Sequence, residues 1–272
     1  LGLVSAVAPQ LVESNIVSRI VELEKEYSPS DWRVGFKIAE EVAKEKFCKF
    51  ESKKEATEVG IRTGFMYLTG GIVSAPLEGF VEIKIKNNKE GKEYVACVYA
   101  GPIRGAGGTA AATSVILADY VATKMGYAKY DPTEEEINRI MTEVLDYNDR
   151  VTNLQYLPSK DEIKFIIKNL PVEVDGEPTE RIEVSQYKNL ERIETDLIRG
   201  GVCLVVGEGL CQKAPKLWKR LKTWGKDFGI DWSFLDDFLK LQKEIKAKGK
   251  KKEGSKGISP NFTFIADMVA GR

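Results

Sequence analysis

The sequence predicts an α+β fold that is rich in helix and holds a small, mainly antiparallel sheet of three to four strands. Apolar residues recur with a helical period over much of the chain, as at Ile16, Ile20 and Leu23. Over residues 81–86 apolar and charged residues alternate instead, which is typical of a half-exposed strand. Hydrophobic residues make up 43% and charged residues 30% of the 272 residues, which is the balance of a globular protein.

The N-terminal part, residues 1–71, is expected to be helical. Apolar residues fall on one helix face over 12–23 and again over 32–47, and residues 29–31 (PSD) supply a break and a cap between the two helices. A third helix is predicted over 53–69, because the two glycines that follow cannot easily continue it.

A core over residues 72–245 is expected to contain the sheet. Residues 81–85 and 94–100 are predicted to form an antiparallel hairpin, since the segment between them is rich in turn-forming residues. The second of these strands is apolar without a break, which indicates burial on both faces. A third strand is predicted at 202–206, and shorter candidates lie at 172–174 and 181–184, around a turn at 175–176.

Helices are predicted for most of the remaining core. One runs over 109–125, and two more begin at the capping boxes Thr133 with Glu136 and Ser159 with Glu162. A basic helix ends near Trp224. The last helix spans about 233–246, a solvated Lys-rich linker follows at 246–257, and residues 258–272 begin the next segment.

Composition excludes several kinds of chemistry. Lysine plus arginine equals aspartate plus glutamate at 41 each, so nucleic-acid binding must come from local patches. The absence of histidine removes Ser–His and Cys–His nucleophiles and imidazole metal ligands. No apolar run approaches the roughly 18 residues of a membrane span, so we expect a cytoplasmic protein without membrane contact. The isolated cysteines predict buried thiols rather than zinc or disulfides: Cys48, Cys97, Cys203 and Cys211.

The Gly-rich residues 101–108 lie between a predicted buried strand and a predicted helix. Glycine lets backbone amides approach an anion, and a helix N-terminus adds partial positive charge. Arg104 is therefore a candidate clamp for a phosphate, and Gly105, Gly107 and Gly108 would shape the loop. A tight strand-to-helix turn, in which glycine only permits the backbone angles, explains these residues equally well.

The same segment also matches a dinucleotide-binding pattern, G-x-G-x-x-A, at Gly105, Gly107 and Ala110. Its context argues against such a site. The preceding strand belongs to a hairpin, and the next helix leads into further helices instead of a second parallel strand with a ribose-binding carboxylate. A nucleotide-binding enzyme that uses residues 101–110 stays open as an alternative.

Arg199, Lys213 and Lys216 are the other candidates for phosphate contacts. Cations recur through residues 213–222 with tryptophans between them, so that this helix can follow a phosphate backbone. A solvated, charge-rich helix face explains the pattern at least as well. The carboxylate pairs are better explained by capping and solubility than by metal-dependent catalysis, so no catalytic residue or metal ligand is predicted: Asp146 with Asp149, and Asp236 with Asp237.

Five blocks of sequence, taken together, resemble the N-terminal region of the large subunit of the archaeal D-family DNA polymerase. The resemblance covers about residues 53–221. The blocks are residues 71–79 (GIVSAPLEG), 99–104 (YAGPIR) with 107–110 (GGTA), 154–156 (LQY), 199–201 (RGG), and 208–209 (EG) with 212–214 (QKA).

This resemblance implies a role within a two-subunit replicative polymerase whose large subunit polymerises DNA and whose small subunit is a proofreading exonuclease. It places the catalytic aspartates and zinc modules elsewhere, so no cofactor is expected here, and Mg²⁺ and zinc are expected in the rest of the subunit. The chain is then a non-catalytic domain that binds primer-template DNA non-specifically and braces the assembly. The implied partners are DNA, the exonuclease subunit, the rest of the large subunit and, as a further candidate, the sliding clamp.

A structural module that never touches DNA is the main alternative. It predicts that Arg104 is bound internally, for instance by Glu78 or Glu194, and that no basic surface is exposed. The nucleotide-binding alternative predicts a pocket beside residues 105–108.

Overall fold

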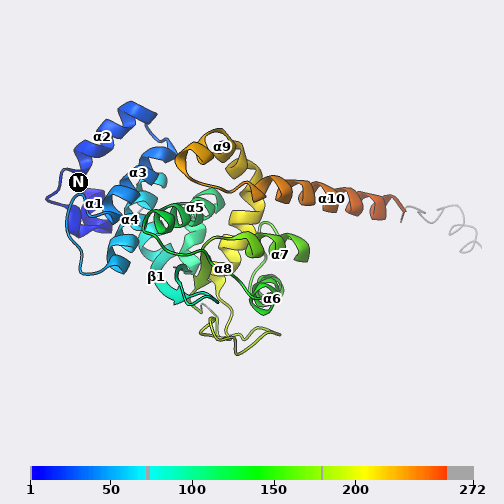
Figure 1. The fold of residues 1–272 in the computed structure, drawn as a ribbon. Helices are drawn as coiled ribbons and strands as arrows, with labels where there is room; N and C mark the ends of the chain where they lie inside the picture. Colours follow the sequence, from blue (N-terminus) through cyan, green and yellow to red (C-terminus); the bar gives the residue numbers. More distant parts are fainter. Residues whose placement is uncertain (1, 72–73, 179, 256–272) are drawn as a thin grey trace, which may run out of the picture.

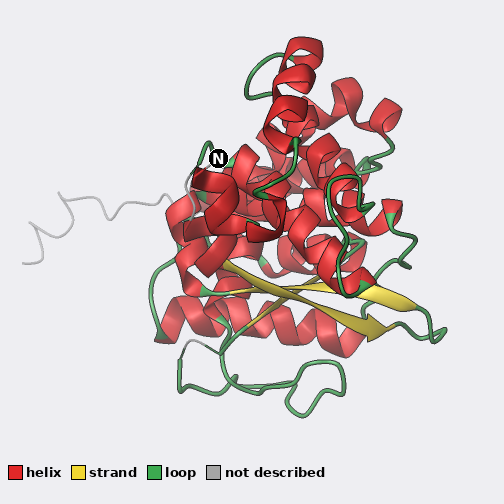
Figure 2. Cartoon of the chain, turned by 90° about the vertical axis from the view of Figure 1, so that its left-hand side faces the viewer, coloured by secondary structure: helices red, strands yellow, loops and turns green. Residues whose placement is uncertain are grey.

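The computed structural model describes residues 2–71, 74–178 and 180–255. Helices make up most of the body, and three strands form a narrow sheet toward one end of it (Figures 1 and 2). The α+β, helix-rich class predicted from the sequence is confirmed.

The N-terminal part is helical, as predicted. It consists of α1 (Gly2–Val7), the short turn η1 (Pro9–Leu11), α2 (Ile16–Tyr27), α3 (Trp32–Ala43) and α4 (Lys53–Leu68). The side chains of Asp31 and Ser52 accept hydrogen bonds from first-turn amides of α3 and α4. The two helices lie close together, because a Cβ atom on Gly64 would come within 2.7 Å of the carbonyl oxygen of Gly35.

The sheet is built on the predicted hairpin. β1 (Phe80–Asn87) pairs antiparallel with β2 (Glu93–Tyr99), and the Asn88 side chain accepts hydrogen bonds from two amides of the turn between them. β3 (Glu173–Gly176) lies on the other side of β2 and runs parallel to it. The sheet is therefore mixed, with β2 in the centre as expected.

The prediction of a strand at 202–206 is wrong. This stretch is helical, in α8 (Gly200–Leu204) and the π-helical segment η4 (Val205–Cys211). A short apolar run without alternation fits a helix buried on every side as well as it fits a buried strand. The helix packs directly against the end of β2, since a Cβ atom on Gly201 would lie 2.3 Å from the carbonyl oxygen of Tyr99.

The shorter strand candidates had mixed outcomes. The candidate at 172–174 supplies the first half of β3, but Asp175 and Gly176 continue the strand instead of turning it. The candidate at 181–184 makes only an isolated bridge, between Glu183 and Leu197.

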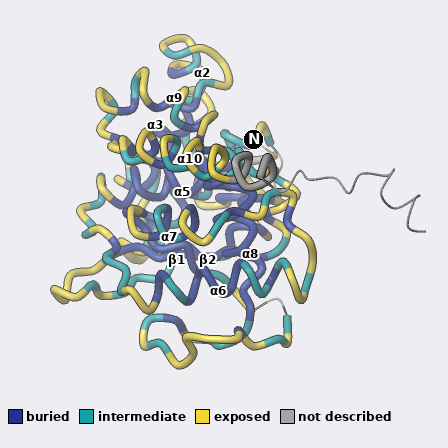
Figure 3. Tube along the Cα trace, turned by 90° about the vertical axis from the view of Figure 1, so that its right-hand side faces the viewer, coloured by how far each residue is buried: buried dark blue, intermediate teal, exposed yellow. Residues whose placement is uncertain are grey.

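The predicted helices of the core are present, and both capping boxes are confirmed. Two turns, η2 (Ala75–Gly79) and η3 (Gly101–Ala106), flank the hairpin; the helices are α5 (Gly108–Lys124), α6 (Glu134–Arg150), α7 (Lys160–Asn169) and α9 (Gln212–Phe228). Buried residues concentrate along α5, β2 and α8, which form the centre of the molecule (Figure 3).

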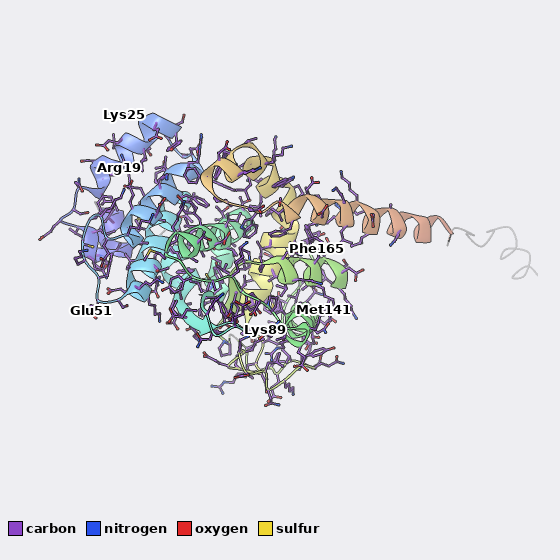
Figure 4. The ribbon with its side chains drawn as sticks, viewed as in Figure 1. Arg19, Lys25, Glu51, Lys89, Met141 and Phe165 are labelled. Carbon is purple, nitrogen blue, oxygen red and sulfur yellow. The ribbon has the colours of Figure 1, made fainter. Side chains whose placement is uncertain are left out.

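The last helix, α10 (Phe234–Ser255), is longer than predicted and projects from the body (Figure 1). Its first half packs against α7, where the ring centres of Phe165 (labelled in Figure 4) and Phe238 lie 5.7 Å apart. The predicted linker at 246–257 is helical as far as Ser255, and the lysines, glutamate and alanine of this stretch favour a helix. The segment predicted at 258–272 lies outside the described residues.

Candidate nucleic-acid interface

The Gly-rich segment forms a compact turn that places Arg104 at the surface. β2 ends at Tyr99, η3 follows, and α5 begins at Gly108. The Nη2 atom of Arg104 donates a hydrogen bond to Oε1 of Glu208 at 2.9 Å, while 37% of the arginine side chain stays exposed. Its other donors make no hydrogen bond within the part of the chain that the structure describes, so they are free for a phosphate.

Glu208 is the residue that sequence analysis missed. It lies in the π-helical segment η4, at the point where α8 passes into α9. Its buried carboxylate also accepts a hydrogen bond from the backbone amide of Gln155. Because Glu208 belongs to one of the family-like blocks, the sequence did offer a signal. The structural-module alternative named Glu78 or Glu194 as examples of an internal partner of Arg104, and the partner in the structure is Glu208 instead.

Two lysines of α9 reach toward the first turn of α5. Nζ of Lys216 lies 3.4 Å from Oγ1 of Thr109, and Cε of Lys213 lies 3.0 Å from the position that a Cβ atom on Gly108 would take. Lys213 makes no hydrogen bond or ion pair within the described residues. Two lysines thus lie beside the N-terminus of α5, and Arg104 binds Glu208, whose backbone borders the same N-terminus. The partial positive charge of the helix N-terminus also favours an anion.

The three glycines of the turn have different roles. A Cβ atom on Gly108 would lie 2.1 Å from the carbonyl oxygen of Glu208, so α5 can approach η4 only because this residue is glycine. Gly107 has a φ of +78°, which disfavours any side chain. A Cβ atom on Gly105 would meet nothing within 4 Å, so this residue keeps the surface open without being required by packing.

Arg199, the fourth predicted phosphate contact, lies in the core. Its side chain is 1% exposed and donates hydrogen bonds to Glu143 at 2.8 Å and to Asp175 at 2.7 Å. The RGG block therefore supplies an internal clamp between α6, β3 and α8. Arg199 is not available to a phosphate in this structure.

The Arg199 clamp belongs to a larger buried ionic network. Lys86 of β1 binds Glu173 at 2.8 Å and Asp175 at 2.9 Å, and Arg139 of α6 lies 3.5 Å from Glu143. Burial alone would raise the pKa of Asp175, but Arg199 and Lys86 outweigh it and hold that pKa at about 2. Asp175 is therefore ionised at neutral pH, and the charges of the network face one another instead of solvent.

The two alternatives can be compared with this geometry. Arg104 does have an internal partner, as a purely structural module predicts, but Lys216, Lys219 and Lys222 are exposed on α9. The argument from context against a dinucleotide site was wrong on one point, since β3 is parallel to β2 and carries Asp175. That carboxylate is engaged by Arg199 and Lys86, so it is not available to a ribose.

The remaining candidate side chains are engaged locally. Asp146 accepts hydrogen bonds from Ser185, and Asp236 pairs with Lys240 at 3.1 Å. Among the described residues there is no group of three His, Cys, Asp or Glu side chains arranged to hold a metal ion. No described helix is long and apolar enough to span a membrane. Three of the cysteines are buried and Cys48 is partly exposed, and all four carry free thiols.

Comparison with known proteins identifies the family. The family model described as "DNA polymerase II large subunit DP2, N-terminal" matches residues 3–241. The chain belongs to this family. It is 50% identical over 272 aligned residues, 98% of its length, to the DNA polymerase II large subunit of Nanoarchaeum equitans. It is 42% identical over 254 residues, 93% of its length, to the protein of that name in Thermococcus kodakarensis.

The resemblance drawn from the five sequence blocks is thus confirmed, and with it the assignment to the N-terminal part of the large subunit. The chain spans only part of these relatives, 22% of the first and 14% of the second. The matched region includes η3, η4 and all of α9, and therefore the three cations Arg104, Lys213 and Lys216, which we call the basic surface.

Proposed function

We propose that this domain binds DNA through its phosphate backbone and thereby helps a DNA polymerase II large subunit to hold primer-template DNA. The observation that carries the proposal is the convergence of Arg104, Lys213 and Lys216 around the N-terminus of α5. The family name refers to a DNA polymerase, so we take DNA to be the anion that binds here. In this proposal, polymerisation and any Mg²⁺ or zinc that it uses belong to other parts of the subunit. The protein works in the cytoplasm.

The geometry favours contacts to phosphate over the reading of bases. Lysine and arginine at a helix N-terminus bind the backbone and position it, whereas sequence is read by side chains that reach base edges in a groove. Arg104 is held by Glu208 at the rim of the turn, and Lys216 lies along the surface against Thr109. Binding is therefore expected to be independent of sequence.

The chain's charge balance agrees with local binding of this kind. Positive and negative residues cancel overall, at 41 each, and many form pairs inside the molecule. The basic surface keeps a surplus because Glu208 is the one carboxylate bonded to Arg104, Lys213 or Lys216 among the described residues. A weakly basic surface of this size suits a domain that assists other DNA contacts.

The test is fluorescence anisotropy of two labelled primer-templates of unrelated sequence at about 0.05 M salt, where phosphate contacts are strong. We expect equal affinity for both sequences, and about a tenfold loss in Arg104→Ala and in the double variant Lys213→Ala/Lys216→Ala. Lys168→Ala, which removes an exposed lysine of α7, serves as the control for the loss of one positive charge in Arg104→Ala. An affinity that differs tenfold between the sequences, or that all variants lower equally, contradicts the proposal.

A second proposed role is to brace the polymerase core and its partners, meaning the rest of the large subunit, the exonuclease subunit and the sliding clamp. One observation favours it. Val17 and Val21 lie one turn apart on α2 and are 39% and 46% exposed, which is high for large apolar side chains. Co-purification of the exonuclease subunit with the complete large subunit, compared between wild type and Val17→Ser/Val21→Ser, tests this role. Unchanged recovery contradicts it for this surface.

A nucleotide site at the Gly-rich segment is a weaker alternative, favoured by the strand–turn–helix order of β2, η3 and α5 and by the parallel β3. It predicts that a nucleoside triphosphate raises the melting temperature of the wild-type chain but not of Arg104→Ala. An unchanged melting temperature at millimolar nucleotide excludes it.

A further inference from the structure

A cleft beside the basic surface has features that a phosphate-binding surface alone does not require. It has a volume of about 680 Å³ and lies between the turn that joins α2 to α3 and the outer face of α9. Lys216 lines it and also contacts Thr109 at the start of α5. The cleft is therefore continuous with the surface that we propose to bind DNA.

Cations dominate the walls of the cleft. Arg33 comes from the side of α3, and Lys216, Lys219 and Arg220 come from α9. The one carboxylate of the lining, Asp31, pairs with Arg33 at 2.9 Å and caps α3. Lys219 and Arg220 make no ion pair within the described chain. A surplus of positive charge is thus left for a negatively charged occupant.

Aromatic rings lie behind these cations. The guanidinium carbon of Arg220 lies 4.5 Å from the ring centre of Trp32, and that of Arg33 lies 4.7 Å from the ring centre of Tyr27. Each arginine is held against a ring by a cation–π contact, which fixes its plane. Trp224 of α9 contributes a third ring to the lining.

We propose that this cleft receives unpaired nucleotides of a DNA strand whose duplex part lies on the basic surface. Bases stack on aromatic rings and on guanidinium planes, while the phosphates between them bind lysine. A volume of 680 Å³ is within the range of small-molecule sites, so the cleft holds about one or two nucleotides and excludes a duplex. The inference rests on the proposed function, because Lys216 joins the two surfaces.

The features of the cleft fit a nucleic-acid strand better than a purely acidic partner. Tyr27 and Trp32 are already covered by Arg33 and Arg220, so a base would stack on the two guanidinium planes and on the Trp224 ring. A carboxylate-rich peptide would need the cations but would not stack on these flat surfaces. Base stacking tolerates any sequence, since every base has a flat aromatic face, and this agrees with a domain that does not read bases.

The test compares a dT oligonucleotide of about ten residues, a length within the usual site size of single-strand binders, with a blunt duplex, both labelled for anisotropy. We expect Arg220→Ala to weaken binding of the oligonucleotide about tenfold and binding of the duplex less than twofold. Lys222→Ala is the matched control, since Lys222 is exposed on the same helix but lies outside the cleft. It should affect both ligands little and equally.

Tryptophan fluorescence gives a second readout of the same proposal. Bases that stack in the cleft should quench the emission of Trp224, so the quenching by oligo-dT should largely disappear in Trp224→Phe while the fold is kept. Quenching that is unchanged in this variant overturns the proposal, as does an equal loss of oligonucleotide and duplex binding in Arg220→Ala.

The two proposals fail in distinguishable ways. Wild-type chain that binds the duplex but not oligo-dT leaves the proposed function standing and removes the cleft as a site for unpaired nucleotides. Chain that binds neither ligand at low salt removes both.

Discussion

Two groups of basic residues that look alike in the sequence have opposite environments in the structure. Arg199 is buried and Lys86 is mostly buried, and both are engaged by Glu143, Glu173 or Asp175. Lys213 is half-buried and Lys216 is exposed, and neither has an ionic partner in the described chain. Arg104 is intermediate, with one buried partner and an exposed side. A family-like block that contains an arginine can therefore serve the core of the fold or its surface.

The environment of each cation determines whether it contributes to folding or to the binding of DNA. A buried arginine that is bonded on both edges holds three elements together, and any phosphate would have to displace its carboxylates. An exposed lysine contributes little to folding but attracts a polyanion from a distance. Stability and DNA affinity should therefore respond to different residues, and each of the predictions below tests that separation.

The largest effect is expected for Arg199→Ala. Removing this side chain leaves Glu143 and Asp175 buried without their main cation, which costs about 3–5 kcal/mol of unfolding free energy. Urea unfolding measures the loss, and Lys216→Ala, at the exposed end of the comparison, should change the same quantity by less than about 1 kcal/mol. Equal losses in the two variants would break the distinction.

A smaller but clear effect is expected for Gly108→Ala. The new Cβ atom would clash with the Glu208 carbonyl at 2.1 Å, so α5 or η4 must move, at about 2 kcal/mol or more. Gly105→Ala is the matched control, because its Cβ atom meets nothing within 4 Å and its unfolding free energy should stay the same or rise slightly. Thermal unfolding of both variants checks this, and a similar loss at Gly105 would contradict the packing account.

Asp119 adds a third case to the comparison of buried and exposed charges, because it is buried but has no ion pair in the described chain. Burial raises its pKa to about 6, although Trp232 and Thr123 donate hydrogen bonds to it. The folded chain therefore holds this proton more tightly than the unfolded chain. The resulting stability is present below about pH 4 and is lost as the pH rises through 6.

Asp119→Asn should remove that pH dependence. The amide can still accept from Trp232 but carries no charge, so the unfolding free energy should rise by about 1–3 kcal/mol at pH 7.5 and change little at pH 4. Urea unfolding of both proteins at the two pH values measures it. A variant that is less stable at pH 7.5 would show that the buried carboxylate is stabilised by its surroundings.

The smallest effects are expected at single lysines of the surface. Lys213→Ala or Lys216→Ala should each weaken duplex binding about threefold and leave the unfolding free energy within about 0.5 kcal/mol of wild type. Anisotropy and urea unfolding on the same samples separate the two quantities. A loss of more than about 1 kcal/mol of stability would place these lysines in the fold instead.

Much of the fold could be predicted from the sequence, because local signals decided it. The helices over 32–47 and 53–69, the hairpin, and the capping boxes at Thr133 and Ser159 all rest on residues close together in the chain. The stretch 202–206 was misassigned because an apolar run carries no period, and the helix that it forms packs against Tyr99, about a hundred residues away, through Gly201.

The candidate site was predictable only in part for the same physical reason. The residue types and the glycines of the turn were visible, but the partner of each charge was not. Arg104 meets Glu208 and Arg199 meets Glu143 across separations of 104 and 56 residues. Whether a cation faces solvent depends on such long-range pairs, so Arg199 and Lys213 could not be distinguished before the structure.

The central claim is that Arg104, Lys213 and Lys216 contact phosphates of DNA, and the salt dependence of binding tests it most directly. The affinity for a primer-template should be measured from about 0.05 to 0.2 M salt for wild type and for Arg104→Ala/Lys213→Ala/Lys216→Ala. We predict that the slope of log affinity against log salt becomes shallower by about 2.7 in the triple variant, since each phosphate contact contributes about 0.9. An identical slope in the two proteins would contradict the claim.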